Sequence, residues 1–264
     1  MTYTKKVFQG VSIVFLCNVL AAGVAYLTRI VLARTLSPAE YGLFSAVLTF
    51  TIFFLFFRDL GMGDALVRFI PQFQVQKKFD QIKTVLTGVF LVQLITSLIL
   101  AVLFILFADV LASNYFKDAQ AKPLLLIFVV YIMTSIFFTN LKSIFQGFQR
   151  MTFYPLVELT KNSIILLLTL ILLRFGLGVR APALAYALSS LILVVIFVPV
   201  ALRTFSFYRY RITNLLAQTK ELFFFGLPIL IVREDQREAA QHMLEVLAGQ
   251  AVQARRQRID LIKE

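Results

Sequence analysis

The chain has 264 residues, of which 59% are hydrophobic and 15% are charged, and its formal net charge is +12. A mean hydropathy of +0.84 excludes an ordinary soluble domain, in which about 45–50% of the residues are apolar. Basic residues in the loops of a membrane protein record topology more often than nucleic-acid binding. The composition therefore predicts a multi-spanning membrane protein with no nucleic-acid partner.

Six apolar segments are long enough to cross a bilayer as helices, because a hydrocarbon core of about 30 Å needs about 20 residues. They do not alternate as barrel strands would. In chain order they cover residues 8–32, 41–57 with an extension to residue 70 left open, 85–112, 123–145, 156–175 and 181–202. The first is too long for the core of a cleaved signal peptide, so we expect it to be retained. The sequence predicts an all-α polytopic membrane helix bundle.

Prolines mark several predicted helix starts, since proline fits the first turn of a helix but disrupts its interior. Three lie at or beside such a start: Pro123, Pro155 and Pro182. Before the second segment, Ser37 and Glu40 have the spacing of a capping box, with Pro38 at the first helical position. We therefore expect the second helix to begin close to Pro38.

The distribution of lysine and arginine predicts the orientation of the chain. One set of loops and helix ends carries Lys5, Lys6, Arg68, Lys77, Lys78, Lys83, Lys142, Arg150, Lys161, Arg203, Arg209, Arg211 and Lys220. The opposite side carries only Arg34, Lys117, Lys122, Arg174 and Arg180. Because short cytoplasmic loops are enriched in these residues, we expect a multi-pass protein of the plasma (inner) membrane with a cytoplasmic N terminus.

The chain changes character near its end. Residues 221–232 are mostly apolar but too few to span a bilayer, and they include Pro228. Residues 233–264 are polar, with small and apolar residues at helical spacing, which predicts a short amphipathic helix. The expected organisation is a six-helix transmembrane lobe over residues 1–220, the truncated start of a seventh helix over 221–232, and a polar tail over 233–264.

Catalytic and metal-binding patterns are missing from the sequence. His242 is the only histidine and Cys17 the only cysteine, so neither has a partner at metal-ligand spacing. Gly61 and Gly63 lack the third glycine and the preceding strand of a dinucleotide-binding fingerprint. We expect no metal, no organic cofactor and no enzymatic activity.

The strongest functional signal is charge at membrane depth, which costs at least about 2.5–3.5 kcal/mol per residue at a helix centre. Arg29 lies in the outer part of the first segment. Arg58 lies about 24 Å along the second segment. At this depth two roles are open for Arg58: binding a ligand, or snorkelling to the headgroups. If that helix continued through the glycines, Arg58, Asp64 and Arg68 would share a polar face. Asp64 precedes Arg68 by four positions, so these two residues can pair with each other.

A second polar pair lies at the start of the fifth segment. Glu158 and Lys161 are three residues apart, which is the spacing of an ion pair on a helix. An exposed pair of this kind contributes about 0–1 kcal/mol. A local ion pair is therefore favoured over a ligand role, which stays open.

Several blocks of the sequence resemble a known family. LARTLSPAEYGLFSAVLTF (residues 32–50), followed by RDLGMGDALVRFIPQF (residues 58–73), is similar to the amino-terminal signature of the polysaccharide and O-antigen flippases of the multidrug/oligosaccharidyl-lipid/polysaccharide exporter superfamily. FQGFQRMTFYPLVELTKNSI and ALAYALSSLI resemble the fourth-to-sixth helix region, and ELFFFGLPILI resembles the start of the seventh helix. The resemblance covers residues 1–231.

The resemblance implies one lobe of a MATE-like transporter that moves polyprenyl-diphosphate-linked oligosaccharide from the inner to the outer leaflet by alternating access. Basic residues that face the cavity of such flippases are thought to hold the diphosphate and the sugar. Arg29 and Arg58 match arginines on the first two helices, Asp59 and Gly61 match a D-L-G, and arginine forks suit a diphosphate. The candidate substrate-binding residues are Arg29, Arg58, Asp59, Arg68 and Lys161.

The chain departs from this family in length. Such flippases have two lobes, whereas this chain supplies six spans and the start of a seventh. We expect it either to pair with a second lobe, in another chain or as a homodimer, or to be a truncated form that does not transport.

The sequence supports two other functions less well. A drug or cation exporter of the same superfamily would need unpaired carboxylates deep in its helices, yet the acids of the spans lie near predicted helix ends: Asp59, Asp64, Asp109 and Glu158. A polysaccharide polymerase or ligase would need a sizeable outward loop with reactive groups, and the outward loops here are short. The lipid-linked oligosaccharide and the bilayer are therefore the expected partners.

Overall fold

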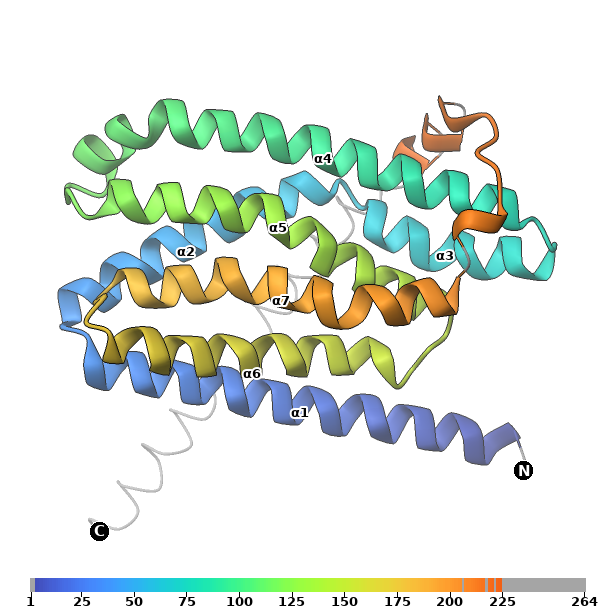
Figure 1. The fold of residues 1–264 in the computed structure, drawn as a ribbon, viewed down its shortest axis with the longest axis horizontal. Helices are drawn as coiled ribbons and strands as arrows, with labels where there is room; N and C mark the ends of the chain where they lie inside the picture. Colours follow the sequence, from blue (N-terminus) through green and yellow to red (C-terminus); the bar gives the residue numbers. More distant parts are fainter. Residues whose placement is uncertain (1–2, 206, 217, 221, 225–264) are drawn as a thin grey trace, which may run out of the picture.

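The computed structural model describes residues 3–205, 207–216, 218–220 and 222–224, which form a helical bundle without strands (Figure 1). The elements are α1 (Tyr3–Thr35), α2 (Pro38–Asp59), α3 (Met62–Val75), α4 (Phe79–Val110), a π-helical turn (Leu111–Tyr115), α5 (Ala121–Gly147), α6 (Phe153–Arg174), α7 (Arg180–Thr204) and a 3₁₀ turn (Phe207–Arg209). Six of these helices are long and apolar enough to span a membrane. The predicted all-α polytopic bundle is confirmed.

The long helices run side by side along the bundle axis (Figure 1). α1 packs on α6, α6 on α7, α7 on α5 and α5 on α4, while α2 and α3 pack against α4 and α5. α1 and α6 end on the same side, where Thr35 and Arg174 line a shallow surface hollow. We call this side of the bundle the Thr35 end.

The helix starts follow the sequence signals. The Ser37 backbone N–H donates to the Glu40 carboxylate at 3.0 Å, and the Glu40 backbone N–H donates to Ser37 Oγ at 3.3 Å, so the predicted capping box caps α2. Pro38 is the first residue of the helix, as expected. Helices α5, α6 and α7 each begin two residues before the proline that marked their predicted start: Pro123, Pro155 and Pro182.

The second predicted segment does not continue as one helix to residue 70. Leu60 and Gly61 adopt left-handed backbone conformations, with φ of 49° and 69°, and these end α2 before α3 begins. Glycine adopts this region without the steric cost that other residues meet. No continuous helical face therefore joins Arg58 to Asp64 and Arg68. Asp64 and Arg68 lie four positions apart on α3, and their pairing stays a prediction.

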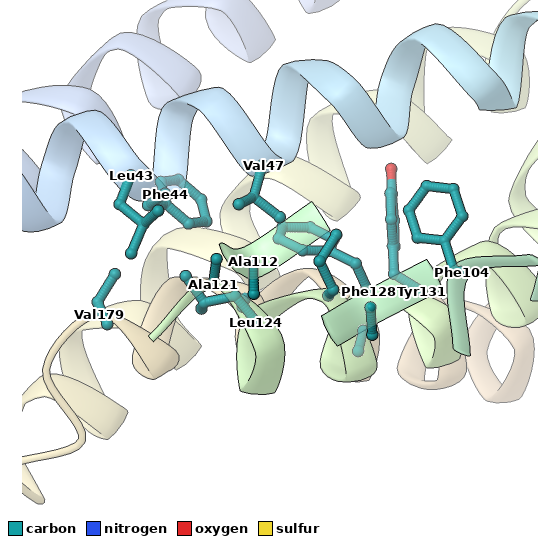
Figure 2. Packing of buried hydrophobic residues seen from close by; sticks show 14 of the residues in the cluster. Leu43, Phe44, Val47, Phe104, Ala112, Ala121, Leu124, Phe128, Tyr131 and Val179 are labelled. Atoms are coloured by element: carbon teal, nitrogen blue, oxygen red, sulfur yellow. The ribbon is translucent and has the colours of Figure 1, made fainter. Parts of the chain in front are cut away.

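The main apolar cluster fixes α2 against α5 (Figure 2). Val47 of α2 points toward Phe128, Leu43 lies nearer Val179, and the ring centroids of Phe44 and Phe128 are 6.2 Å apart. Lipid tails are as apolar as these side chains, so close packing stabilises such contacts within a membrane. The cluster sets the rotation of α2 and leaves Tyr41, Ser45 and Thr49 on the face toward α1 and α6.

Residues 225–264 lie outside the described residues. They include most of the predicted seventh-helix start over 221–232 and all of the predicted tail over 233–264 with its amphipathic helix. The division of the chain at residues 220 and 232 stays a prediction.

Candidate functional site

A hollow of about 300 Å³ lies between α1, α2, α6 and α7, toward the Thr35 end. Its polar lining residues come from all four helices: Thr28, Arg29, Tyr41, Ser45, Thr49, Asn162 and Tyr186. Described residues that line it include no carboxylate. We call this space the Arg29 hollow.

Arg29 is the one charged residue among the described residues that line the hollow. Its side chain is exposed, and within the described part of the chain its guanidinium has no hydrogen-bond partner and no carboxylate at ion-pair distance. A guanidinium carries several N–H donors in a fixed fork. These donors are available to a group that enters the hollow.

Hydroxyl and amide groups surround this guanidinium. Ser45 and Thr49 lie one helical turn apart on α2, so both face the hollow. Tyr186 brings a phenol from α7. The Asn162 side-chain amide donates to the backbone carbonyl of Ala21 at 3.1 Å, which joins α6 to α1 at this level. An arginine among neutral donors, without a carboxylate, is an arrangement suited to an anion.

Arg58 lies in a different environment, because its side chain is only 3% exposed. One guanidinium nitrogen donates to the Ile132 carbonyl at 3.1 Å and to Ser135 Oγ at 2.6 Å, and the other terminal nitrogen donates to Thr139 Oγ1 at 3.2 Å. All three partners belong to α5. Snorkelling to the headgroups, one of the two roles left open for Arg58, is therefore wrong.

Asp59 extends this polar contact to α4. Gln93 Nε2 donates to Asp59 Oδ1 at 2.7 Å, and Asn140 Nδ2 donates in turn to Gln93 Oε1 at 2.6 Å. Gly63 fits closely beside it, since a Cβ there would lie 3.2 Å from Asp59 Oδ2 and 3.1 Å from Ser143 Oγ. Together these hydrogen bonds join the end of α2 to α4 and α5. We call the connected residues the polar junction: Arg58, Asp59, Gln93, Ser135, Thr139 and Asn140.

The remaining two candidates neither line the Arg29 hollow nor belong to the polar junction. Arg68 is exposed on α3. Lys161 of α6 lies over the ring of Phe138, with Nζ 3.9 Å from the ring centroid. The ion pair expected between Glu158 and Lys161 is replaced by one between Glu158 and Lys142 of α5, at 2.9 Å, because α5 and α6 are antiparallel neighbours. Lys161 acts on Glu158 electrostatically without that contact.

Sequence reasoning missed the amides and hydroxyls of these sites. Gln93 and Asn140 each stand inside an apolar span, and an amide at membrane depth is a signal that could have found them. Ser45, Thr49 and Asn162 carry a weaker signal, because single polar residues of this size occur throughout membrane helices. Their common orientation toward Arg29 is visible only once the four helices are assembled.

Proteins of similar sequence agree with the membrane fold. The sequence model of the polysaccharide biosynthesis protein family matches residues 7–234. An uncharacterized membrane protein of Methanocaldococcus jannaschii is 27% identical over 208 residues, which cover 75% of this chain and 41% of that protein. The chain thus spans about two fifths of the length of this curated relative. No solved structure matched the chain. By this match over most of its length, the chain belongs to the polysaccharide biosynthesis protein family and is a multi-pass membrane protein of that family.

Proposed function

We propose that the chain is a lobe of a flippase that translocates polyprenyl-diphosphate-linked oligosaccharide for polysaccharide biosynthesis, and that the Arg29 hollow receives the diphosphate. The observation that carries this proposal is the exposed Arg29 guanidinium, which has no protein partner among the described residues and lies in a hollow lined by neutral donors. Membership of the polysaccharide biosynthesis family supports a polysaccharide precursor as the cargo.

The chemistry of the hollow supports an oxyanion as its occupant. Guanidinium and phosphate form paired N–H···O bonds, which are shorter and stronger than hydrogen bonds between neutral groups. Hydroxyls of Tyr41, Ser45 and Thr49 can donate to the remaining oxygens. The absence of carboxylates from the described lining means that no like charge opposes the ligand.

The size of the hollow limits what it can hold. About 300 Å³ is at the lower end of ligand pockets, which range over about 300–1,000 Å³. This space suits phosphate groups and is too small for an oligosaccharide with its lipid. In this proposal the glycan and the prenyl chain lie outside the lobe, where a second lobe or a second copy of the chain would complete the path.

The other arginine and aspartate candidates receive structural roles in this proposal. Arg58 and Asp59 are engaged with α4 and α5 in the polar junction, so we assign them to helix packing. Arg68 is exposed on α3 and is assigned to the water-facing surface beyond the span.

The loop charges support a location in the inner membrane with the N terminus in the cytoplasm. In that orientation the Thr35 end faces outward. Arg29 then lies about 9 Å below the outer end of α1, at 1.5 Å per residue. The hollow would therefore hold the head group on the release side of the membrane.

Export of a cation or a drug is supported less well. Such transport needs an available carboxylate in the spans. Asp59 accepts a hydrogen bond from Gln93, and two further acids of the described spans are paired with lysine: Asp109 with Lys122 and Glu158 with Lys142. These partners make the acids poor receptors for a transported cation.

The proposed function is tested in cells whose surface polysaccharide depends on this gene. Arg29→Ala should lower surface polysaccharide about tenfold or more and cause lipid-linked oligosaccharide to accumulate, because one charge-assisted contact to the ligand is worth about 1.5–3 kcal/mol. Arg34→Ala is the matched control, since Arg34 is exposed on the same helix and does not line the hollow. Normal polysaccharide from a normally expressed Arg29→Ala protein would refute the role of the hollow.

A further inference from the structure

The segment after α7 folds back onto the bundle. It crosses the start of α4, at the end of the bundle opposite the Thr35 end (Figure 1). We call this segment the strap, and its described residues are 205, 207–216, 218–220 and 222–224. The Tyr210 ring stacks on Phe205 and on Phe79, with ring centroids 5.2 Å and 5.4 Å away. The Tyr210 carbonyl also accepts a hydrogen bond from Lys83 Nζ at 2.7 Å, so both ring and backbone hold the strap to the bundle.

Two further hydrogen bonds fasten the strap backbone to the first turns of α4. The Arg211 N–H donates to Asp80 Oδ1 at 2.8 Å, and the Thr213 N–H donates to Thr84 Oγ1 at 2.9 Å. Backbone donors near lipid are costly unless a protein group accepts from them. The Arg211 side chain takes no part in this attachment and is exposed. The strap therefore has a set position on α4 while its outward side chains remain available.

The strap follows α4 from the membrane surface toward the hydrocarbon. Asp80 lies in the first turn of the helix. At Gly88 the strap lies so close that a Cβ would overlap Thr219 Oγ1. The distance from Asp80 to Gly88 is about 12 Å along the helix, at 1.5 Å per residue. Because hydropathy predicts that this span enters the hydrocarbon near Val85, the strap lies at the level of the lipid headgroups and the adjoining acyl chains.

The strap exposes large apolar and basic side chains together. Tyr208, Ile212 and Leu216 are 92%, 49% and 86% exposed. Arg209 and Arg211 alternate with them along the chain and are also exposed. Apolar and aromatic side chains beside lysine or arginine are typical of segments that lie in the membrane interface. A loop that only records topology needs the charges but not the exposed apolar side chains.

The charge around the strap favours an anionic lipid. Residues 205–220 include no acidic residue. Lys77 and Lys78 are exposed in the turn before α4. Asp80 supplies one opposing charge, and its Oδ1 is engaged by the Arg211 N–H. Each lysine or arginine near an anionic leaflet strengthens attraction to it about fivefold, whereas a zwitterionic leaflet offers no such gain.

We propose that the strap is a binding surface for anionic phospholipid, in which Arg209 and Arg211 contact lipid phosphates while the exposed apolar side chains enter the interface. Asp80 is a positioning residue, because it holds the strap backbone and contacts no lipid. The inference goes beyond the proposed function and depends neither on the cargo nor on the Arg29 hollow. In the proposed orientation this surface faces the cytoplasmic leaflet.

The direct test uses the absence of tryptophan from the sequence. Tyr208→Trp places a single fluorophore on the strap of the full chain in nanodiscs. Brominated phospholipids quench tryptophan that they contact, so brominated phosphatidylglycerol is compared with the same fraction of brominated phosphatidylcholine. We expect phosphatidylglycerol to be enriched about fivefold or more beside this reporter. Ile99→Trp is the matched control, because Ile99 is exposed within the apolar part of α4, and its quenching by the two lipids should be equal.

Two results of this comparison would overturn the proposal. Equal quenching of the strap reporter by both lipids would leave the surface to a soluble anionic partner. Absence of quenching by either lipid would show that the strap does not reach the interface. Inorganic phosphate, added at constant ionic strength, should leave the preference unchanged, and its loss there would assign the basic side chains to free phosphate instead.

The arginines have a test of their own in the same reporter protein. Arg209→Gln combined with Arg211→Gln should abolish the preference for phosphatidylglycerol, since two charges that each contribute about fivefold are removed. Quenching by brominated phosphatidylcholine should persist, because the apolar side chains still enter the interface. A preference that survives in the double variant would refute the arginine contacts.

The positioning role of Asp80 is separated from its charge by two substitutions. Asp80→Asn removes the charge but keeps an oxygen that accepts from the Arg211 N–H, so the lipid preference should be retained. Asp80→Ala removes the acceptor as well, so the preference should fall about twofold or more. A surface that acts through charge alone predicts equal preference in the two variants, and that result would overturn the role of Asp80. Melting curves confirm that folded proteins are compared.

Discussion

The two intramembrane arginines of this chain, Arg29 and Arg58, have opposite environments. Arg58 is 3% exposed and donates three hydrogen bonds to one neighbouring helix. Arg29 is exposed in a hollow and has no such partner in the described part of the chain. Charge at membrane depth is costly at either position. In the proposed function, the partners of an intramembrane cation, rather than its depth, separate a residue that holds helices together from one available to a ligand.

The largest effect on stability should come from Arg58→Ala. The variant leaves the acceptors of α5 without their donor, and hydrogen bonds to a charged group are worth about 1.5–3 kcal/mol each, so unfolding should become easier by at least about 3 kcal/mol. Detergent-titrated unfolding followed by circular dichroism measures this. Arg29→Ala should stay within about 0.5 kcal/mol of the wild type. Equal stability of the two variants would remove the contrast between the arginines.

Gln93→Leu should lower the free energy of unfolding by about 1–3 kcal/mol, because Asp59 Oδ1 loses the hydrogen bond from Gln93 Nε2. Ser97→Ala is a matched control one turn further along α4. Its hydroxyl is buried without a hydrogen-bond partner among the described residues, so its removal should not destabilise the protein. A double-mutant cycle with Asn140→Leu should give a coupling of about 0.5–3 kcal/mol in the same unfolding assay. Strict additivity would show that the polar junction is not one network.

The break between α2 and α3 should tolerate little change at Gly61. Gly61→Ala should destabilise by about 1–2 kcal/mol, because a Cβ is disfavoured at a φ of 69°. Gly42→Ala should instead stabilise the protein, since Gly42 lies within helical α2 and a Cβ there meets no atom within 4 Å. Glycine within a helix is less favourable than alanine by about 0.5–1 kcal/mol. Thermal unfolding of both variants checks the signs, and a stabilised Gly61→Ala protein would contradict the left-handed break.

The smallest effects should appear at the hydroxyls of the hollow. Ser45→Ala and Thr49→Val each remove one neutral donor, so pyrophosphate affinity should fall about two- to tenfold, as expected for about 0.5–1.5 kcal/mol per hydrogen bond. Stability should not change, because neither hydroxyl joins the polar junction. Calorimetric titration gives the affinity. If neither substitution alters binding, the anion does not contact this face of α2.

The sequence was sufficient to predict the six spans and the start of α2, because span length, hydropathy and the capping box are local properties. The direction in which Arg58 points was not predictable, since hydropathy gives the depth of a residue and not the helix it faces. The partner of Glu158 was missed for a related reason. Lys142 is sixteen positions away and becomes its neighbour only through the antiparallel packing of α5 on α6.

The most direct test of the contrast is the affinity of Arg29→Gln and Arg58→Gln for farnesyl diphosphate, measured in nanodiscs at a temperature where both variants are folded. Glutamine keeps an amide donor at each position and removes the charge. Arg29→Gln should bind about tenfold more weakly with unchanged melting, whereas Arg58→Gln should melt at a lower temperature and bind within about twofold of the wild type. Weakened binding in Arg58→Gln beside normal binding in Arg29→Gln would contradict the account.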